Sequence, residues 1–234
     1  MLFEGCKTDE LSYSVFNFVH TEIFVDHINK LFTSKVLHLD AHKLATAQAL
    51  NFSKVKVVFF EINAPAAIQD SIHAIKNIRQ SNQTACIFVI ATQLKTFSSA
   101  DCYVAGADYC LKLPNDPEER HTLLSKTIQK SHWATPIQLH LDRTRLLLCS
   151  ASEKIEISYT EMTILDALMQ APEHVMSQDG IAKTLHPNIV FYDPRALEKT
   201  ISRLRTKIKK TYHLELIFSV RGYGYRLRRG TVLG

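Results

Sequence analysis

The 234-residue sequence predicts two domains: an α/β domain with a doubly wound parallel sheet, then an α+β domain that ends in a basic helix and a hairpin. Two observations carry this prediction. Strand-like and helix-like segments alternate between residues 14 and 130. An amphipathic helix is expected at residues 193 to 210, and positive charge collects around it.

The segments of the first domain follow the order expected of a parallel sheet covered by helices. The strand-like segments are SVFNFV, KVLHL, VKVVFFEI, ACIFVIA and DYCLKL. The helix-like segments are EIFVDHINKLF, AHKLATAQALN, DSIHAIKNIRQ, residues 98 to 105 and DPEERHTLLSKTIQK. Nearly continuous apolar strands are typical of a sheet that is buried on both faces. Five strands and five helices in about 120 residues predict a flavodoxin-like fold, with any site at the carboxyl ends of the strands.

The helix expected at residues 193 to 210 has one apolar stripe and a basic remainder. The stripe consists of Leu197, Ile201, Leu204 and Ile208, at helical spacing. Asp193 can cap the first turn, and Pro194 suits the first helical position, where a missing N–H costs nothing. Two β-rich segments follow around Arg221 to Gly224, and this glycine-containing stretch predicts a hairpin or wing.

Charge is distributed unevenly along the chain, whose net charge is +5. Residues 1 to 134 carry 13 basic and 13 acidic residues, whereas residues 135 to 234 carry 15 and 10. Residues 193 to 234 alone hold 11 basic and 3 acidic residues. One end of the second domain is therefore expected to bind a polyanion. A role as a pure protein-interaction adaptor would leave this excess of basic residues unexplained.

The order ISYTEMTILDAL, VMSQDGIAKTL, DPRALEKTISRLRTKI and FSVRGYGYRL resembles the winged helix-turn-helix domain of OmpR/PhoB-type response regulators over residues 137 to 228. The resemblance implies a receiver-like domain at 1 to 130 and a winged-helix DNA-binding domain at 137 to 234. Matching the family motif residue by residue assigns base contacts to Glu198, Lys199, Arg203 and, in the minor groove, Arg221. It assigns phosphate contacts to Arg195, Thr200, Ser202, Arg205 and Ser219.

The receiver-like domain departs from the family at its phosphorylation site. Phosphoryl transfer in the family needs an acidic pair for Mg²⁺, a phosphoacceptor Asp, a Thr or Ser and a Lys. In this sequence those positions fall on His20 and Thr21, Glu61, Ala91 and Leu113. We therefore expect a degenerate receiver that takes no phosphate by the Mg²⁺-dependent route. Glu61 either imitates the phosphorylated state or is a carboxylate without that role.

Three residues next to those positions leave the alignment open at one point. Thr92 lies one residue from Ala91, Lys112 lies one residue from Leu113, and Tyr109 lies one residue from Cys110, which by resemblance occupies the position of the family's switch aromatic. A local slip would restore them, although it would also reverse the strand face. No acidic pair and no acceptor Asp would return. In the family the fifth strand and its flanking helices carry dimer contacts, and Leu123 here occupies an arginine position. An apolar dimer face is one interpretation; the other is that Leu123, Leu124 and Ile128 are core residues.

These observations predict a sequence-specific DNA-binding transcriptional regulator of the two-component type that acts as a homodimer independently of aspartyl phosphorylation. The alternative is phosphorylation or ligand sensing through receiver residues that the family does not use. An enzyme is not expected, since the sequence contains no G-x-G-x-x-G, no P-loop and no nucleophile-base spacing. We expect no cofactor or metal, because the five cysteines show no C-x-x-C spacing.

Location and partners follow from the same pattern. The chain begins without a signal peptide and contains no run of about 18 apolar residues, so we expect a cytoplasmic protein with no membrane contact. Double-stranded DNA and a second copy of the chain are the expected partners. By resemblance, the loop before the basic helix would contact RNA polymerase.

Overall fold

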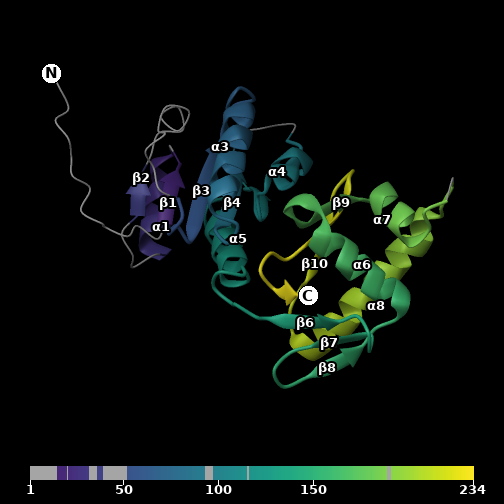
Figure 1. The fold of residues 1–234 in the computed structure, drawn as a ribbon. Helices are drawn as coiled ribbons and strands as arrows, with labels where there is room; N and C mark the ends of the chain where they lie inside the picture. Colours follow the sequence, from purple (N-terminus) through teal and green to yellow (C-terminus); the bar gives the residue numbers. More distant parts are fainter. Residues whose placement is uncertain are drawn as a thin grey trace.

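The computed structural model describes residues 15–19, 21–31, 36–38, 52–92, 97–114, 116–188 and 191–234. Figure 1 shows an N-terminal α/β domain beside a C-terminal domain of helices and small sheets, and the fold class is as predicted. The helix expected at 41 to 51 lies outside the described residues. Within the described ranges, no helix combines the length and the apolar character that a bilayer span requires. The domain division at residues 130 and 137 stays a prediction.

The N-terminal sheet has five parallel strands in the order β2, β1, β3, β4, β5. This is the strand order of flavodoxin-like folds. The strands are β1 (Val15–Phe18), β2 (Val36–His38), β3 (Val57–Ile62), β4 (Cys86–Ala91) and β5 (Tyr109–Lys112). The helices are α1 (Glu22–Leu31), α3 (Ala67–Ser81), α4 (Ser99–Ala105) and α5 (Pro117–Gln129).

The central strands β3 and β4 are buried along their whole length, as their unbroken apolar sequences predict. Aromatic rings cross the sheet on one face: the centroids of Phe59 and Phe88 are 4.9 Å apart, and those of Phe88 and Tyr109 are 5.0 Å apart. Such stacked pairs stabilise neighbouring strands beyond the area they bury. The sheet is therefore a rigid platform for the segments at its carboxyl edge.

The C-terminal domain packs three helices between two small sheets. One sheet has the order β12, β6, β7, β8, and the other has the order β10, β11, β9. The helices are α6 (Tyr159–Gln170), α7 (Gln178–Leu185) and α8 (Pro194–Tyr212). The strands are β6 (Leu139–Asp142), β7 (Leu147–Cys149), β8 (Lys154–Glu156), β9 (Val175–Ser177), β10 (Ile217–Val220), β11 (Gly224–Leu227) and β12 (Val232–Leu233).

The start of α6 confirms the capping box predicted from the sequence. The backbone N–H of Ser158 donates to the Glu161 carboxylate at 2.8 Å, and the N–H of Glu161 donates to the Ser158 hydroxyl at 3.2 Å. Reciprocal bonds of this kind satisfy two of the backbone donors that a helix start leaves unpaired. The helix therefore begins at a defined residue and presents its apolar side to α8.

A buried charge network joins the two domains. The carboxylate of Asp108, just before β5, accepts from Arg79 of α3 at 2.5 Å and from Arg229, which follows β11, at 3.0 Å. Arg229 also donates to Glu173 at 2.7 Å. Burial alone would raise the pKa of Asp108, but Arg79, His132, Arg229 and the hydrogen bond from the Ile87 backbone N–H together outweigh it and hold that pKa below its usual range. Each buried charge in this network is therefore compensated by an oppositely charged partner, and removing one partner would leave another charge buried and unpaired.

Two further arginines of the C-terminal domain contact the receiver-like domain, along the side where Figure 1 shows the end of the chain facing it. The guanidinium of Arg226 lies 4.7 Å from the Tyr103 ring centroid and 4.3 Å from that of Phe218. Arg228 donates to the backbone oxygens of Lys130 and Thr135 at 3.2 and 2.8 Å. In this arrangement the surface of α4, β5 and α5 contacts the chain's own C-terminal domain.

The three leucine and isoleucine residues considered for a dimer face divide between the two interpretations. Leu124 and Ile128 are buried core residues, at 1% and 6% exposure, whereas Leu123 keeps 36% of its surface exposed. The core interpretation therefore holds for two of them. Leu123 remains available to a partner or a ligand.

Candidate nucleic-acid interface

Helix α8 forms as its sequence predicts. The Asp193 carboxylate accepts from the backbone N–H of Arg195 at 2.9 Å, and Pro194 is the first helical residue. The predicted stripe is buried and is extended by Tyr212, whose hydroxyl donates to the backbone oxygen of Leu148. These contacts fix one face of α8 to the domain core, so the opposite face is held outward.

The outward face of α8 carries the predicted base-contacting residues. Glu198, Lys199 and Arg203 are all exposed, and Lys199 lies one turn before Arg203. A helix of this kind fits the major groove, where arginine and lysine donate to guanine edges. The geometry therefore leaves these three side chains free for DNA, and their individual roles stay predictions.

The wing is a hairpin of β10 and β11 that pairs with β9. Gly222 in its turn has φ of +72°, a conformation that favours glycine. A Cβ on Gly224 would lie 2.2 Å from the backbone oxygen of Met176, so the close approach of β9 requires glycine there. Arg221 is exposed beside the turn, where the minor-groove role was predicted.

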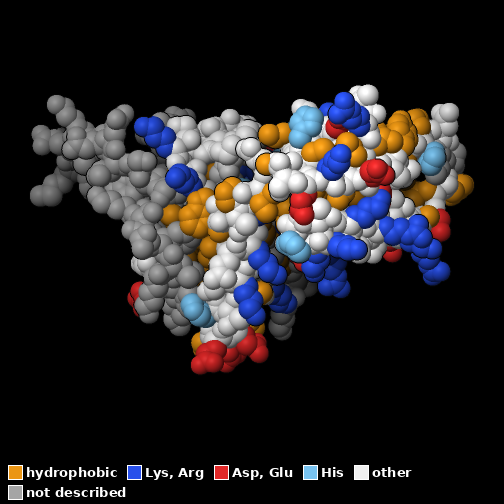
Figure 2. Space-filling view, turned by 90° about the horizontal axis from the view of Figure 1, so that it is seen from below, with side chains coloured by type: hydrophobic (Ala, Val, Ile, Leu, Met, Phe, Trp, Pro, Cys, Tyr) orange, Lys and Arg blue, Asp and Glu red, His pale blue; other side chains and the backbone are white. Residues whose placement is uncertain are grey.

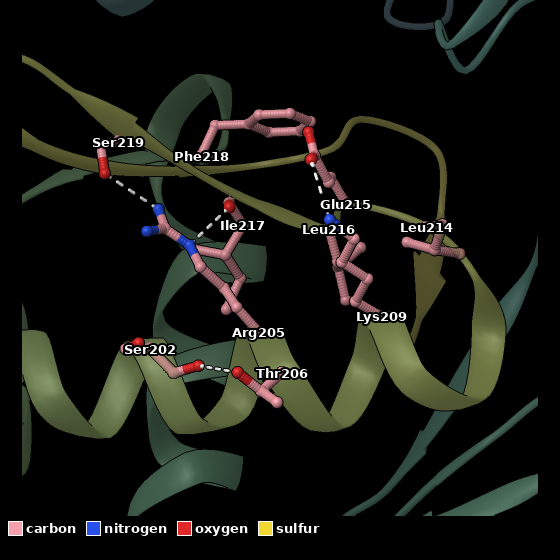
Figure 3. Close-up of a pocket in the computed structure, with 10 residues that line it drawn as sticks. All are labelled: Ser202, Arg205, Thr206, Lys209, Leu214, Glu215, Leu216, Ile217, Phe218 and Ser219. Atoms are coloured by element: carbon pink, nitrogen blue, oxygen red, sulfur yellow. Dashed lines mark hydrogen bonds and ion pairs between the residues drawn. The ribbon is translucent and has the colours of Figure 1, made fainter.

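A crevice of about 370 Å³ separates α8 from β10 (Figure 3). Three of the predicted phosphate-contacting residues line it: Ser202, Arg205 and Ser219. Figure 3 shows Arg205 extending from α8 toward β10, where it donates to the Ile217 backbone oxygen at 2.8 Å and to the Ser219 hydroxyl at 3.0 Å. Burial lowers the pKa of Arg205. Arg205 therefore ties the wing to the helix, a second role that the sequence did not indicate.

The remaining predicted phosphate contacts are Arg195 and Thr200. Arg195 is exposed in the first turn of α8. The hydroxyl of Thr200 donates to the backbone oxygen of Ala196 at 3.0 Å, which leaves its oxygen able to accept but commits its proton. Both assignments stay predictions.

The charge distribution needs one correction. Arg226, Arg228 and Arg229 belong to the 11 basic residues counted between 193 and 234, yet they are 6%, 3% and 5% exposed, because the domain contact covers them. Lys207 also turns toward protein, since its amine donates to Glu161 at 2.7 Å. Figure 2 shows blue side chains gathered over the C-terminal domain, but the part available to DNA is α8 and the wing tip.

Glu61, which the resemblance aligns with the phosphoacceptor position, lies near the end of β3. Its carboxylate is 4% exposed and accepts from the Thr21 backbone N–H at 2.9 Å, the Thr21 hydroxyl at 2.5 Å and the Thr92 hydroxyl at 3.0 Å. Three hydrogen bonds from two side chains and one backbone N–H therefore hold this carboxylate in place. Thr21, which the resemblance aligns with a metal-ligand position, therefore donates two hydrogen bonds to Glu61. His20 lies outside the described residues.

Two of the aligned receiver positions, Ala91 and Leu113, are filled by apolar residues. The hydroxyl that reaches Glu61 belongs to Thr92, one residue after the predicted Ala91, which is buried in the core. This is the one-residue slip that the sequence left open, and the assignment of the Thr or Ser position stays a prediction. Leu113 packs against the hydrophobic core beside β5. It supplies no amine to the site.

The described residues place no group of three potential metal ligands around Glu61. They bring one such group together elsewhere: Cys86, Asp108 and His132, whose ligand atoms lie within 4.8 Å of one another. Both Asp108 oxygens already accept from guanidinium groups, which would repel a cation. Burial also raises the pKa of the Cys86 thiol. This cluster is therefore better described as part of the domain contact than as a metal site.

Comparison with known proteins agrees with this geometry. A family model described as "Transcriptional regulatory protein, C terminal" matches residues 152–227. The chain is 28% identical over 190 residues to the transcriptional regulatory protein YxdJ of Bacillus subtilis (strain 168), covering 75% of this chain and 80% of YxdJ. It is 25% identical over 164 residues to the transcriptional regulatory protein PhoP of Escherichia coli (strain K12), covering 67% and 73%.

Two solved structures are also similar. One is the C-terminal domain of the nisin resistance regulator NsrR, a lantibiotic response regulator: 35% identity, TM-score 0.34, covering 38% of this chain and 89% of that one. The other is the response regulator DrrB of Thermotoga maritima: 15% identity, TM-score 0.38, covering 91% and 97%. The named relatives are transcriptional regulators rather than enzymes. Residues 152–227 therefore form a C-terminal domain of the transcriptional regulatory type, and the similarity to YxdJ and PhoP supports a DNA-binding response regulator of the OmpR/PhoB type.

Proposed function

We propose that this DNA-binding transcriptional regulator recognises specific duplex sequences as a homodimer and does so without aspartyl phosphorylation. The observation that carries the proposal is the pairing of an outward basic helix α8 with a glycine-dependent wing across one crevice. An exposed basic helix and an adjacent wing on one domain can contact a major groove and the neighbouring phosphates together.

The proposed contacts divide into readout and positioning. Glu198, Lys199 and Arg203 would meet base edges in the major groove, and Arg221 would enter the neighbouring minor groove. Backbone phosphates would be held by Arg195, Thr200, Ser202, Arg205 and Ser219. Since Arg205 also holds Ser219, helix and wing would engage phosphate as one unit.

Independence from phosphorylation rests on the surroundings of Glu61. Its carboxylate already accepts three hydrogen bonds from Thr21 and Thr92, and the Mg²⁺ that family chemistry needs would have to compete with these donors. A saturated buried carboxylate also supports the idea that Glu61 acts as a fixed imitation of the phosphorylated state. The alternative keeps a signal, either phosphate or a ligand, at residues the family does not use.

Two partner contacts complete the proposal. A homodimer through α4, β5 and α5 would require the C-terminal domain to leave that surface, since Arg226 and Arg229 occupy it here. RNA polymerase would contact the loop before α8, where Phe191 is 91% exposed while Tyr192 is held by a hydrogen bond to Asp179 at 2.9 Å. Such an exposed aromatic side chain beside a fixed one is typical of a protein-contact site.

The test is selection of random DNA duplexes by the full-length, untreated protein, followed by sequencing. We expect enrichment of two similar half-sites about one helical turn apart. Absence of any enriched sequence would contradict sequence-specific binding. A parallel selection after acetyl phosphate or beryllofluoride treatment should give the same sequences at the same affinity; a clear gain would contradict phosphorylation independence.

A further inference from the structure

A cavity of about 520 Å³ lies between the two domains and remains unassigned by the DNA-binding function. Its walls come from β5 and α5 on one side, from the linker at Thr135 and Ile137, and from the end of α8 with β10 and β11 on the other. Cavities of this size at domain boundaries are typical of sites for small organic ligands. Glu61 is not among its lining residues, and the cavity shares Lys209, Leu214, Glu215 and Phe218 with the crevice between α8 and β10.

The lining of this cavity is strongly basic. Five of its side chains are basic and one, Glu215, is acidic. The basic residues are Lys126, Lys130, Lys209, Arg226 and Arg228. Glu215 lies 4.0 Å from Lys209, so it offsets one of those charges at most. Positive charges from two domains therefore surround one cavity, and a bound anion would reduce the repulsion between them.

Two buried arginines leave hydrogen-bonding capacity unused at the cavity. Arg228 is 3% exposed, and its Nε and Nη1 have no hydrogen-bond partner within the described part of the chain. The same holds for Nε of Arg226, which is 6% exposed. These nitrogens are enclosed by protein, and buried charged donors are normally paired, so both guanidinium groups leave uncompensated positive charge in the cavity wall.

The rest of the lining is apolar and aromatic. Tyr109, Leu123, Ile137, Leu214 and Phe218 border the same space. Leu123 is 36% exposed and borders the cavity, so its apolar side chain can pack against a ligand bound there. Inorganic phosphate alone would leave these surfaces uncovered, whereas an anion with an apolar body would cover them.

We propose that the interdomain cavity binds a small organic anion, with a carboxylate, phosphate or sulfonate group held by Arg228 and the lysines and an apolar body against Leu123 and Phe218. Because such a ligand would contact both domains, it would favour the docked arrangement over separated domains. The domain contact would then respond to a metabolite class rather than to phosphorylation of Glu61.

The experiment titrates full-length protein with 8-anilinonaphthalene-1-sulfonate, an aromatic anion, and follows its fluorescence. We expect saturable binding of one molecule per chain, with Lys126→Glu and Lys209→Glu each weakening it at least tenfold. The matched controls are Lys76→Glu on α3 and Lys183→Glu on α7, exposed positions outside the cavity that make the same charge change. Both controls should bind like the unmodified protein.

Two additional arms sharpen the result. The neutral analogue N-phenyl-1-naphthylamine should bind more weakly and should not distinguish Lys126→Glu from Lys76→Glu. Competition by benzoate and by phenyl phosphate identifies which anionic group the site prefers. Circular dichroism of each variant checks its fold. Absence of saturable binding, or equal weakening by the cavity and control variants, would overturn the proposal.

Discussion

The arginines on the recognition helix and wing differ from those that follow β11 in what surrounds them, although both groups come from the same basic stretch. Arg203 and Arg221 are exposed and have their donors free for DNA. Arg229 and Arg226 are buried against Asp108 and aromatic rings. Arginines of one domain therefore have two roles, DNA binding and contact with the other domain, and their burial distinguishes the two. Variants at each group should separate stability from DNA binding.

The largest expected effect is on stability. Arg229→Met removes a buried guanidinium and leaves Asp108 and Glu173 to share Arg79, so we expect a loss on the order of 3 kcal/mol. Chemical unfolding of the full chain measures it. The matched control Arg221→Met changes an exposed arginine and should stay within about 0.5 kcal/mol. Equal unfolding curves for both variants would remove the proposed difference between the two groups.

The next effect is on sequence preference. Arg203→Ala should cost about 1–3 kcal/mol in binding to the selected site and should relax preference at one base, because it removes a base-edge donor. Competition binding with single-base variants of the site measures both. Unfolding of Arg203→Ala should match the unmodified protein. Full retention of preference would show that Arg203 does not read a base.

Arg205→Ala should act on both properties. Loss of its bonds to Ile217 and Ser219 should loosen the wing by about 0.5–1.5 kcal/mol and weaken binding to all sequences alike. Hydrogen exchange at β10 and binding to selected and random duplexes measure the two effects. The neighbouring variant Thr206→Ala, which lines the same crevice, is the control. A change in base preference would contradict a phosphate role.

The smallest effect is the pH dependence of the domain contact. The folded-state pKa of Asp108 lies below its ordinary value of 3.8, so its stabilisation is present above 3.8 and is lost as pH falls toward the folded-state pKa. Between pH 5 and pH 3 the unmodified chain should therefore lose more stability than Asp108→Asn. Unfolding across that range measures the difference, and parallel curves would contradict the role of Asp108.

Much of this structure follows from local sequence patterns. Period and capping residues identified α8 and α6 because the stripe from Leu197 to Ile208 and the pair of Ser158 and Glu161 are signals within one helix. Unbroken apolar runs likewise identified β3 and β4. Such signals need no knowledge of the remaining chain.

The errors concern residues whose partners lie far away in sequence. Arg229 meets Asp108 across 121 positions, and nothing in the local pattern distinguishes it from the exposed Arg221. The cavity between α5 and β10 was missed for the same reason. The choice between Ala91 and Thr92 stayed open for a related reason: the end of β4 sets which side chain faces Glu61, and the exact end of a strand is hard to predict from sequence.

Strand β11 is only four residues long, and its two faces contact different parts of the molecule. Side chains alternate along a strand, so Tyr225 faces the effector core near Arg205, and Arg226 faces the rings of the receiver-like domain. The DNA-binding surface and the contact with the neighbouring domain are therefore connected through one short strand. By linkage, whatever factor docking imposes on DNA affinity, DNA must impose on docking, so a promoter would itself act as an effector of this protein's shape.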